Sequence, residues 1–147
     1  MKWRYTFAVA APIQQVYRVA SPPRWMSFYL PRFYDGIEHA DASWPDAGAT
    51  IVLRYRFGPF PLLISQSITR HDPGHLISIE EAAFGGLWMD HNDIILRETP
   101  DGTAIRVVSD QTSPYWPLRW LAPLRWLTNW LDIAPALRRC AAMVEEG

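Results

Sequence analysis

The fold is decided by a stretch of alternating side chains and regularly spaced turn residues, WPDAGATIVLRYRFGPFPLLISQSITRHDPG at positions 44–74. Glycine and proline return at Gly48, Gly58-Pro59 and Pro73-Gly74, where they suit the backbone angles of tight turns. The runs between these turns are short and rich in Ile, Val, Leu and Tyr. Short β-prone runs bounded by turn residues predict antiparallel hairpins rather than helices.

The same pattern continues through the middle of the chain, with further turn signals at Gly85-Gly86 and Pro100-Asp101-Gly102. The strands expected from it cover residues 36–44, 49–57, 62–71, 75–84, 87–99 and 103–113. No helical pattern separates them. We therefore predict an antiparallel meander and exclude a doubly wound parallel sheet, which needs crossover helices.

A first strand and two short helices are expected before this meander. Trp3, Tyr5, Phe7 and Val9 alternate with polar or small residues, as in a half-buried strand. Pro12 then suits the first turn of a helix, which Pro22-Pro23 ends. A second short helical turn is expected over residues 25–29, closed by Pro31.

The C-terminal part of the chain changes to a helical period. One side of a helical projection collects the apolar residues and one arginine: Leu124, Leu127, Leu131, Ala134, Arg138 and Ala141. This pattern predicts an amphipathic C-terminal helix. Pro135 either lies in the first turn of a second helix capped by Asp132 or kinks one long helix. The predicted class is α+β, a seven-stranded curved antiparallel sheet wrapped around a long C-terminal helix.

Composition limits what the protein can be. With 147 residues, 49% hydrophobic and 20% charged, the chain is expected to form one domain over residues 1–147. A net charge of −1 argues against a nucleic-acid partner. The single cysteine, Cys140, excludes an internal disulfide and a thiolate-rich metal site, and we expect it to be a packed thiol. No cofactor is expected.

The chain shows no pattern typical of export or membrane insertion. The N-terminal residues alternate instead of forming the uninterrupted apolar run of a signal peptide. No segment reaches the roughly 18 apolar residues of a spanning helix. We therefore expect a cytoplasmic protein with no integral membrane span.

The element order and three motifs together resemble the START/Bet v 1-like (SRPBCC) superfamily, the helix-grip fold that includes polyketide cyclases and lipid-transfer domains. The motifs are residues 11–17 followed by the Pro/Trp break at 22–25, the segment at 43–50, which resembles the family's W-x-x-G entry into the third strand, and the turn at 101–103. The resemblance implies a cavity between the sheet and the C-terminal helix that holds a hydrophobic or aromatic small molecule. One member group carries alternate His residues after a Trp on the sixth strand. Here Asp90 and Asn92 follow Trp88, which argues against that group's chemistry.

The facing of each strand selects the candidate site residues. On the third strand Ile51, Leu53 and Tyr55 point one way and Arg54 and Arg56 the other. The sixth strand fits two facings equally, either Trp88, Asp90, Asn92, Ile94 and Leu96 inward, or Met89, His91, Asp93 and Ile95 inward. The resemblance favours the first.

The polar residues that would then converge on the interior are Tyr55, Gln66, Glu81, Asp90, Asn92 and Gln111. They either orient a ligand inside an apolar pocket or pair with one another and with water near strand ends. The full set of expected ligand-binding residues is Tyr55, Gln66, Ile79, Glu81, Trp88, Asp90, Asn92, Val107, Gln111, Trp120, Leu124 and Leu127.

Three of these residues, Glu81, Asp90 and Tyr55, are candidates for acid–base catalysis. A desolvated Glu81 carboxyl would have a raised pKa and could act as an acid or base. A solvated glutamate beside Glu80 is the favoured reading, because glutamate is rarely fully buried. The leading hypothesis is accordingly a binding protein for a lipid- or polyketide-like molecule. The alternative is a polyketide cyclase or dehydratase.

Two other features of the sequence bear on function. His71 and His75 flank a Pro-Gly turn with no evident third ligand, so no metal site is expected. Residues 116–130 contain four Trp. We rank core and cavity wall first for this segment, a homodimer contact second, and membrane contact third.

Overall fold

The computed structural model describes residues 2–20, 32–113, 117, 120, 131, 135, 136 and 138–146. Its elements are β1 (Lys2–Val9), α1 (Ile13–Ala20), β2 (Tyr34–Ala40), β3 (Thr50–Phe57), β4 (Phe60–Asp72), β5 (Leu76–Ala83), the 3₁₀ turn η1 (Phe84–Gly86), β6 (Trp88–Thr99) and β7 (Gly102–Gln111). Residues 138–145 are helical and form the described end of a C-terminal helix.

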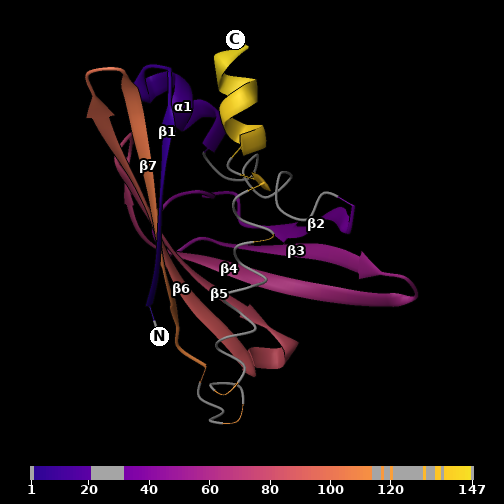
Figure 1. Cartoon of the computed structure of the whole chain (residues 1–147). Coiled ribbons are helices and arrows are strands. Elements are labelled where there is room, and N and C mark those ends of the chain that lie inside the picture. The colour runs from indigo at the N-terminus through magenta and orange to yellow at the C-terminus, as the bar shows by residue number, and fades with distance from the viewer. Residues whose placement is uncertain are drawn as a thin grey trace.

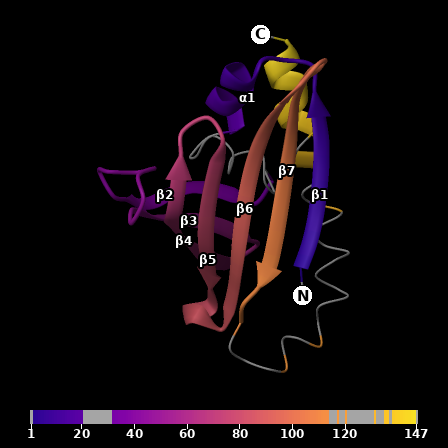
Figure 2. The same ribbon diagram turned by 90° about the vertical axis from the view of Figure 1, so that its left-hand side faces the viewer.

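The strands form one seven-stranded sheet in the order β1-β7-β6-β5-β4-β3-β2, with every neighbouring pair antiparallel. From β2 to β7 each strand pairs with the next in sequence, so the predicted meander is confirmed. β1 forms one edge of the sheet and pairs with β7, the last strand. Figures 1 and 2 show that the sheet turns through a large angle between β7 and β3, as long antiparallel sheets do when their strands twist.

The two helices lie side by side at one end of the sheet (Figures 1 and 2), and both contribute to its core. The Gln15 side-chain amide donates a hydrogen bond to the Val144 carbonyl oxygen at 2.8 Å. The Glu145 carboxylate accepts one from the Ala10 backbone N–H at 3.2 Å. Val16 and Val144 are fully buried against the sheet. The concave side of the sheet is therefore its core side.

A close backbone contact joins the β6–β7 hairpin to the corner between β1 and α1. Gly102 has φ +144°, and a Cβ placed there would lie 2.2 Å from the Val9 carbonyl oxygen. Only glycine fits that approach. Next to it, the Thr103 hydroxyl donates a hydrogen bond to the Ala11 carbonyl oxygen at 2.8 Å. These contacts hold the start of α1 against the sheet.

The segment between β2 and β3, which contains Trp44 and Gly48, forms a loop that connects β2, β3 and β4. The Asp41 carboxylate accepts a hydrogen bond from the Thr50 backbone N–H at 2.8 Å. This bond, followed by the side-chain bond with His39, lowers the pKa of Asp41. The Gly48 N–H donates to the Ile68 carbonyl oxygen at 2.8 Å. The loop thus fixes where β3 enters the sheet.

The described elements agree with the α+β prediction, the seven-stranded curved sheet and a C-terminal helix. The first of the two short helices is α1. The second, expected over residues 25–29, lies outside the described residues, as does the arrangement around Asp132 and Ala134. In the described part of the chain, no helix has the length and apolar character needed to span a membrane.

Candidate ligand-binding site on the concave sheet face

Four polar side chains form one row across the core side of the sheet. Strand register pairs Gln66 of β4 with Glu81 of β5, Glu81 with Asp90 of β6, and Asp90 with Gln111 of β7. Residues paired in this way on neighbouring strands have Cβ atoms about 5 Å apart and point to the same side. We call these four residues the polar row.

The polar row is buried and hydrogen-bonded. Gln66 and Asp90 are 2% and 1% exposed, and Glu81 and Gln111 are half-buried. The Gln66 side-chain amide donates to a Glu81 carboxylate oxygen at 2.8 Å. The Trp88 indole N–H donates to an Asp90 carboxylate oxygen at 2.7 Å. Each of the two carboxylates therefore has a donor in place, which reduces the cost of its burial.

Buried apolar residues flank the polar row on both sides along β4 and β5. One register step away on β4 and β5 lie Ile64 and Ala83, and one step the other way lie Ile68 and Ile79. All four are buried. On these two strands the row is a polar band in an apolar wall, an arrangement that can fix the orientation of an amphipathic molecule.

Asn92 and Ser109 extend the polar surface by one register step on β6 and β7. They pair with each other, and Asn92 also pairs with Ile79. The Ser109 hydroxyl is buried and has no hydrogen-bond partner in the described residues. Sequence reasoning did not select Ser109 for the site. The signal that could have found it is the alternation on β7, which places Ser109 on the same face as Ile105 and Val107.

The register also settles the facing of β6. Asp90 pairs with the inward Glu81, and Ile94 and Leu96 are each 6% exposed. On the outer face, His91 contacts Asp93 at 3.2 Å between Nε2 and a carboxylate oxygen. Trp88, Asp90 and Asn92 therefore lie on the concave side.

Tyr55 faces inward but lies apart from the polar row. It is fully buried and packs edge-on against Tyr34, with ring centroids 5.6 Å apart. Ile51, which pairs with Gln66, is four residues earlier on β3. The Tyr55 Cα is thus about 13 Å along the strand from the row. The structure therefore brings Glu81 and Asp90 together without Tyr55.

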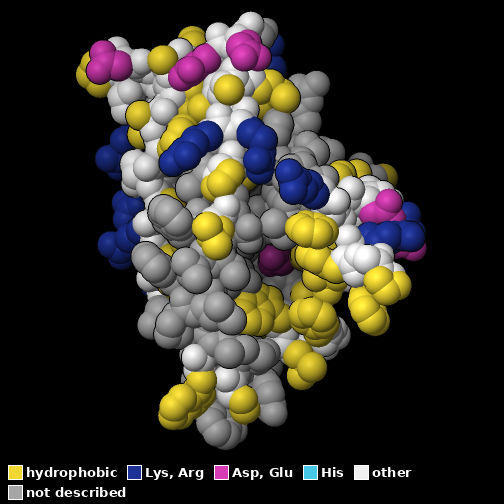
Figure 3. Space-filling model, turned by 45° about the vertical axis from the view of Figure 1, so that its right-hand side comes forward, with side chains coloured by type: hydrophobic (Ala, Val, Ile, Leu, Met, Phe, Trp, Pro, Cys, Tyr) yellow, Lys and Arg dark blue, Asp and Glu magenta, His cyan; other side chains and the backbone are white. Residues whose placement is uncertain are grey.

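The remaining expected site residues are dispersed. Ile79 and Val107 are buried, at 3% and 5% exposure. Trp120 is 78% exposed. Leu124 and Leu127 lie outside the described residues. In the space-filling view an acidic side chain is visible at the bottom of a recess bordered by hydrophobic side chains (Figure 3).

The histidines of the β4–β5 turn do not form a ligand cluster. His71 is hydrogen-bonded through Nε2 to the Tyr17 hydroxyl at 2.5 Å. His75 is exposed. Among the side chains that the structure describes, no group of three His, Cys, Asp or Glu could hold a metal ion.

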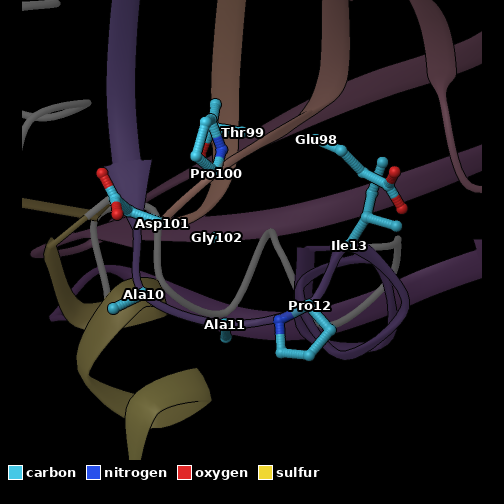
Figure 4. Close-up of a pocket in the computed structure, with 9 residues that line it drawn as sticks. All are labelled: Ala10, Ala11, Pro12, Ile13, Glu98, Thr99, Pro100, Asp101 and Gly102. Atoms are coloured by element: carbon cyan, nitrogen blue, oxygen red, sulfur yellow. The ribbon is translucent and has the colours of Figure 1, made fainter.

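An open groove of about 390 Å³ lies between the β1–α1 corner and the β6–β7 hairpin (Figure 4). Residues 10–13 and 98–102 line it, and its two acidic side chains, Glu98 and Asp101, lie at different places along it. It contains Gly102, whose close approach to Val9 holds the corner together. We assign this groove to the contact between the β6–β7 hairpin and the β1–α1 corner, and not to ligand binding.

Comparison with solved structures identifies the architecture. Ara h 8.0201, a Bet v 1 homologue, superposes with a TM-score of 0.71 at 8% identity, covering 100% of this chain and 99% of its own. This chain has the Bet v 1-like fold. The resemblance noted in the sequence is confirmed at the level of fold.

Two further structures show the same Bet v 1-like fold. Protein CV1439 from Chromobacterium violaceum gives a TM-score of 0.72 at 16% identity, covering 98% of this chain and 97% of its own. DynU16, a protein of the dynemicin biosynthetic locus, gives 0.65 at 21% identity, covering 98% of this chain and 47% of its own. No family model and no curated protein matches the sequence.

Proposed function

We propose that this protein, acting as one domain over residues 1–147, binds a hydrophobic or aromatic small molecule between the concave sheet face and the C-terminal helix. The observation that carries the proposal is the polar row. Two carboxylates and two amides lie side by side on the core face, with buried apolar residues on both sides of them along β4 and β5. Buried polar groups cost about 1–3 kcal/mol each unless they are paired. A sheet that served only as a core would be more stable with apolar residues there.

The chemistry of the polar row indicates what the ligand carries. Ionised Glu81 and Asp90 can only accept hydrogen bonds. A ligand with hydroxyl or amino donors suits these acceptors, whereas a ligand carboxylate would meet like charge. We therefore expect an apolar body with hydroxyl or amino groups, which favours a polyketide-like or aromatic compound over a fatty-acid anion. The location of DynU16 in a biosynthetic locus supports a role with small molecules of this kind.

A matched ligand series tests this proposal. Melting temperature is measured with 2-naphthol, 2-naphthylamine and naphthalene-2-carboxylate, and with dodecanol against dodecanoate. We expect the donor-bearing members to raise the melting temperature more than the anions. Glu81→Gln should reduce the shift, and Glu80→Gln, an exposed neighbour on the outer face, should not. A melting temperature unchanged by every compound would contradict the proposal.

A second candidate function is catalysis by a carboxyl of the polar row, as in a polyketide cyclase or dehydratase. Glu81 and Asp90 face each other in register, and two neighbouring carboxylates disfavour each other's ionised form. A carboxyl that holds a proton at neutral pH can act as a general acid. If there is turnover, Glu81→Gln should abolish it while ligand still binds. Turnover that survives both Glu81→Gln and Asp90→Asn would eliminate this mechanism.

A further inference from the structure

Three arginines lie along a diagonal on the outer face of the sheet, opposite the proposed ligand site. Arg106 of β7 is the central one and pairs with Thr6 of β1 and Ile95 of β6. Arg4 is two residues from Thr6, and Arg97 is two residues from Ile95. Their alternation puts all three on the same face as Arg106. Diagonal neighbours across strands are within reach of long side chains.

A groove of about 330 Å³ runs between these arginines. Its lining consists of Arg4, Thr6, Ile95, Arg97, Ala104 and Arg106. The small residues Ala104 and Thr6 leave room between the longer side chains. This volume falls within the range of pockets that take small molecules, roughly 300–1,000 Å³.

None of the described side chains provides a counter-charge in contact with these three guanidinium groups. Arg4, Arg97 and Arg106 make no ion pair or hydrogen bond in the part of the chain that the structure describes. By contrast, Arg54 on the same side of the sheet contacts Asp35 at 3.1 Å and Glu38 at 3.0 Å.

Two acidic residues on the groove strands, Asp93 of β6 and Asp110 of β7, make polar contacts with residues outside the groove. The Ser78 hydroxyl donates to Asp93 at 2.6 Å, and His91 lies 3.2 Å from the same carboxylate oxygen. Asp110 lies 3.9 Å from the Lys2 ammonium group. Gathering three like charges without a counter-ion opposes folding, so an external anion would relieve the repulsion.

We propose that this outer groove binds the phosphate group of a small phosphorylated molecule. Guanidinium groups form bidentate, charge-assisted hydrogen bonds to phosphate oxygens. Arg106 contributes from the centre of the groove and Arg4 and Arg97 from its two ends. The exposed Thr6 hydroxyl adds a neutral donor. The phosphate is that of a soluble ester or of a lipid headgroup, and the chemistry of recognition is the same for both.

The test is a ¹H–¹⁵N NMR titration of the full chain with glycerol 3-phosphate and with inorganic pyrophosphate at physiological salt. A parallel sedimentation assay uses phosphatidylcholine vesicles with and without phosphatidic acid. We expect the amide signals of Thr6, Ile95 and Ala104 to shift on binding. Binding of the soluble probes identifies a soluble ester, and binding of the phosphatidic acid vesicles alone identifies a lipid headgroup. The site lies on the opposite face from the polar row, so its result is independent of the proposed function.

Charge-matched variants separate a defined site from general attraction. Arg106→Ala should weaken binding at least about tenfold, because hydrogen bonds between charged groups contribute about 1.5–3 kcal/mol. Arg106→Lys should give an intermediate loss. Arg70→Ala removes an exposed arginine of β4 that lies outside the groove and should change affinity less than about twofold. Equal losses in Arg106→Ala and Arg70→Ala, or no binding of any phosphate probe, would overturn the proposal.

Discussion

Glu81 of β5 and Asp90 of β6 are register partners, and each carboxylate accepts a hydrogen bond from a different neighbouring side chain. Gln66 supplies the donor to Glu81 at 2.8 Å and Trp88 supplies the donor to Asp90 at 2.7 Å. This pair occupies the middle of the polar row. In the function we propose, this pair orients the ligand. In the second candidate function, one of its carboxyls is the proton donor.

Removing the Asp90 carboxylate should destabilise the fold through Trp88. Asp90→Ala leaves the Trp88 indole N–H without its acceptor, and we expect the free energy of unfolding to fall by about 1–3 kcal/mol. Asp90→Asn keeps an acceptor oxygen and should cost less than half as much. Urea unfolding followed by tryptophan fluorescence measures both. Equal stabilities for Asp90→Ala and the parent chain would show that the bond contributes nothing.

Gly102 should be the least replaceable glycine among those described. Gly102→Ala places a methyl group 2.2 Å from the Val9 carbonyl oxygen, and we expect a loss of about 2 kcal/mol or more. Gly58→Ala is the matched control, because Gly58 also has a positive φ, +62°, but nothing within 4 Å of its Cβ position. It should cost about 1 kcal/mol. In thermal melts Gly102→Ala should therefore lower the melting temperature more than Gly58→Ala does. A smaller decrease for Gly102→Ala than for Gly58→Ala would refute the close approach.

Cys140 should be unreactive while the protein is folded. It is fully buried, and that burial raises the pKa of its thiol to about 11. The thiol has a lower pKa in the unfolded chain than in the folded protein. As pH rises, it therefore ionises first in the unfolded chain, which favours unfolding. The free energy of unfolding should therefore fall by about 1–2 kcal/mol between pH 9 and pH 11. This decrease should be absent in Cys140→Ala. Rapid labelling of the native protein by a thiol reagent at pH 8 would show that the side chain is accessible.

The strands could be predicted because turn residues and alternation are local signals. The expected range 87–99 and the observed β6, Trp88–Thr99, differ by one residue at the start. The facing of β6 could not be predicted from its own residues, because Asp90 and Asn92 on one side are as polar as His91 and Asp93 on the other. Pairing with Glu81 on β5 decides it.

Alternation gives the face of a strand but not the position along it. Tyr55 satisfies the inward phase of β3, as predicted, yet register sets it far from Glu81 and Asp90. The row of four residues depends on the offsets of three hairpins at once. Each offset is fixed by the turn conformation and by bulges such as the irregularity between Ile68 and Arg70. Sequence reasoning therefore found the members of the row without finding their alignment.

The central claim is most directly tested by a ¹H–¹⁵N NMR titration of the full chain with 2-naphthol. If a ligand lies on the concave face, the backbone amides of Gln66, Glu81 and Asp90 should shift in a saturable way. The amides of Arg97 and Arg106, used as markers of the opposite face, should shift much less. Saturable shifts confined to the outer face, or none in the polar row at the solubility limit of the ligand, would contradict the account.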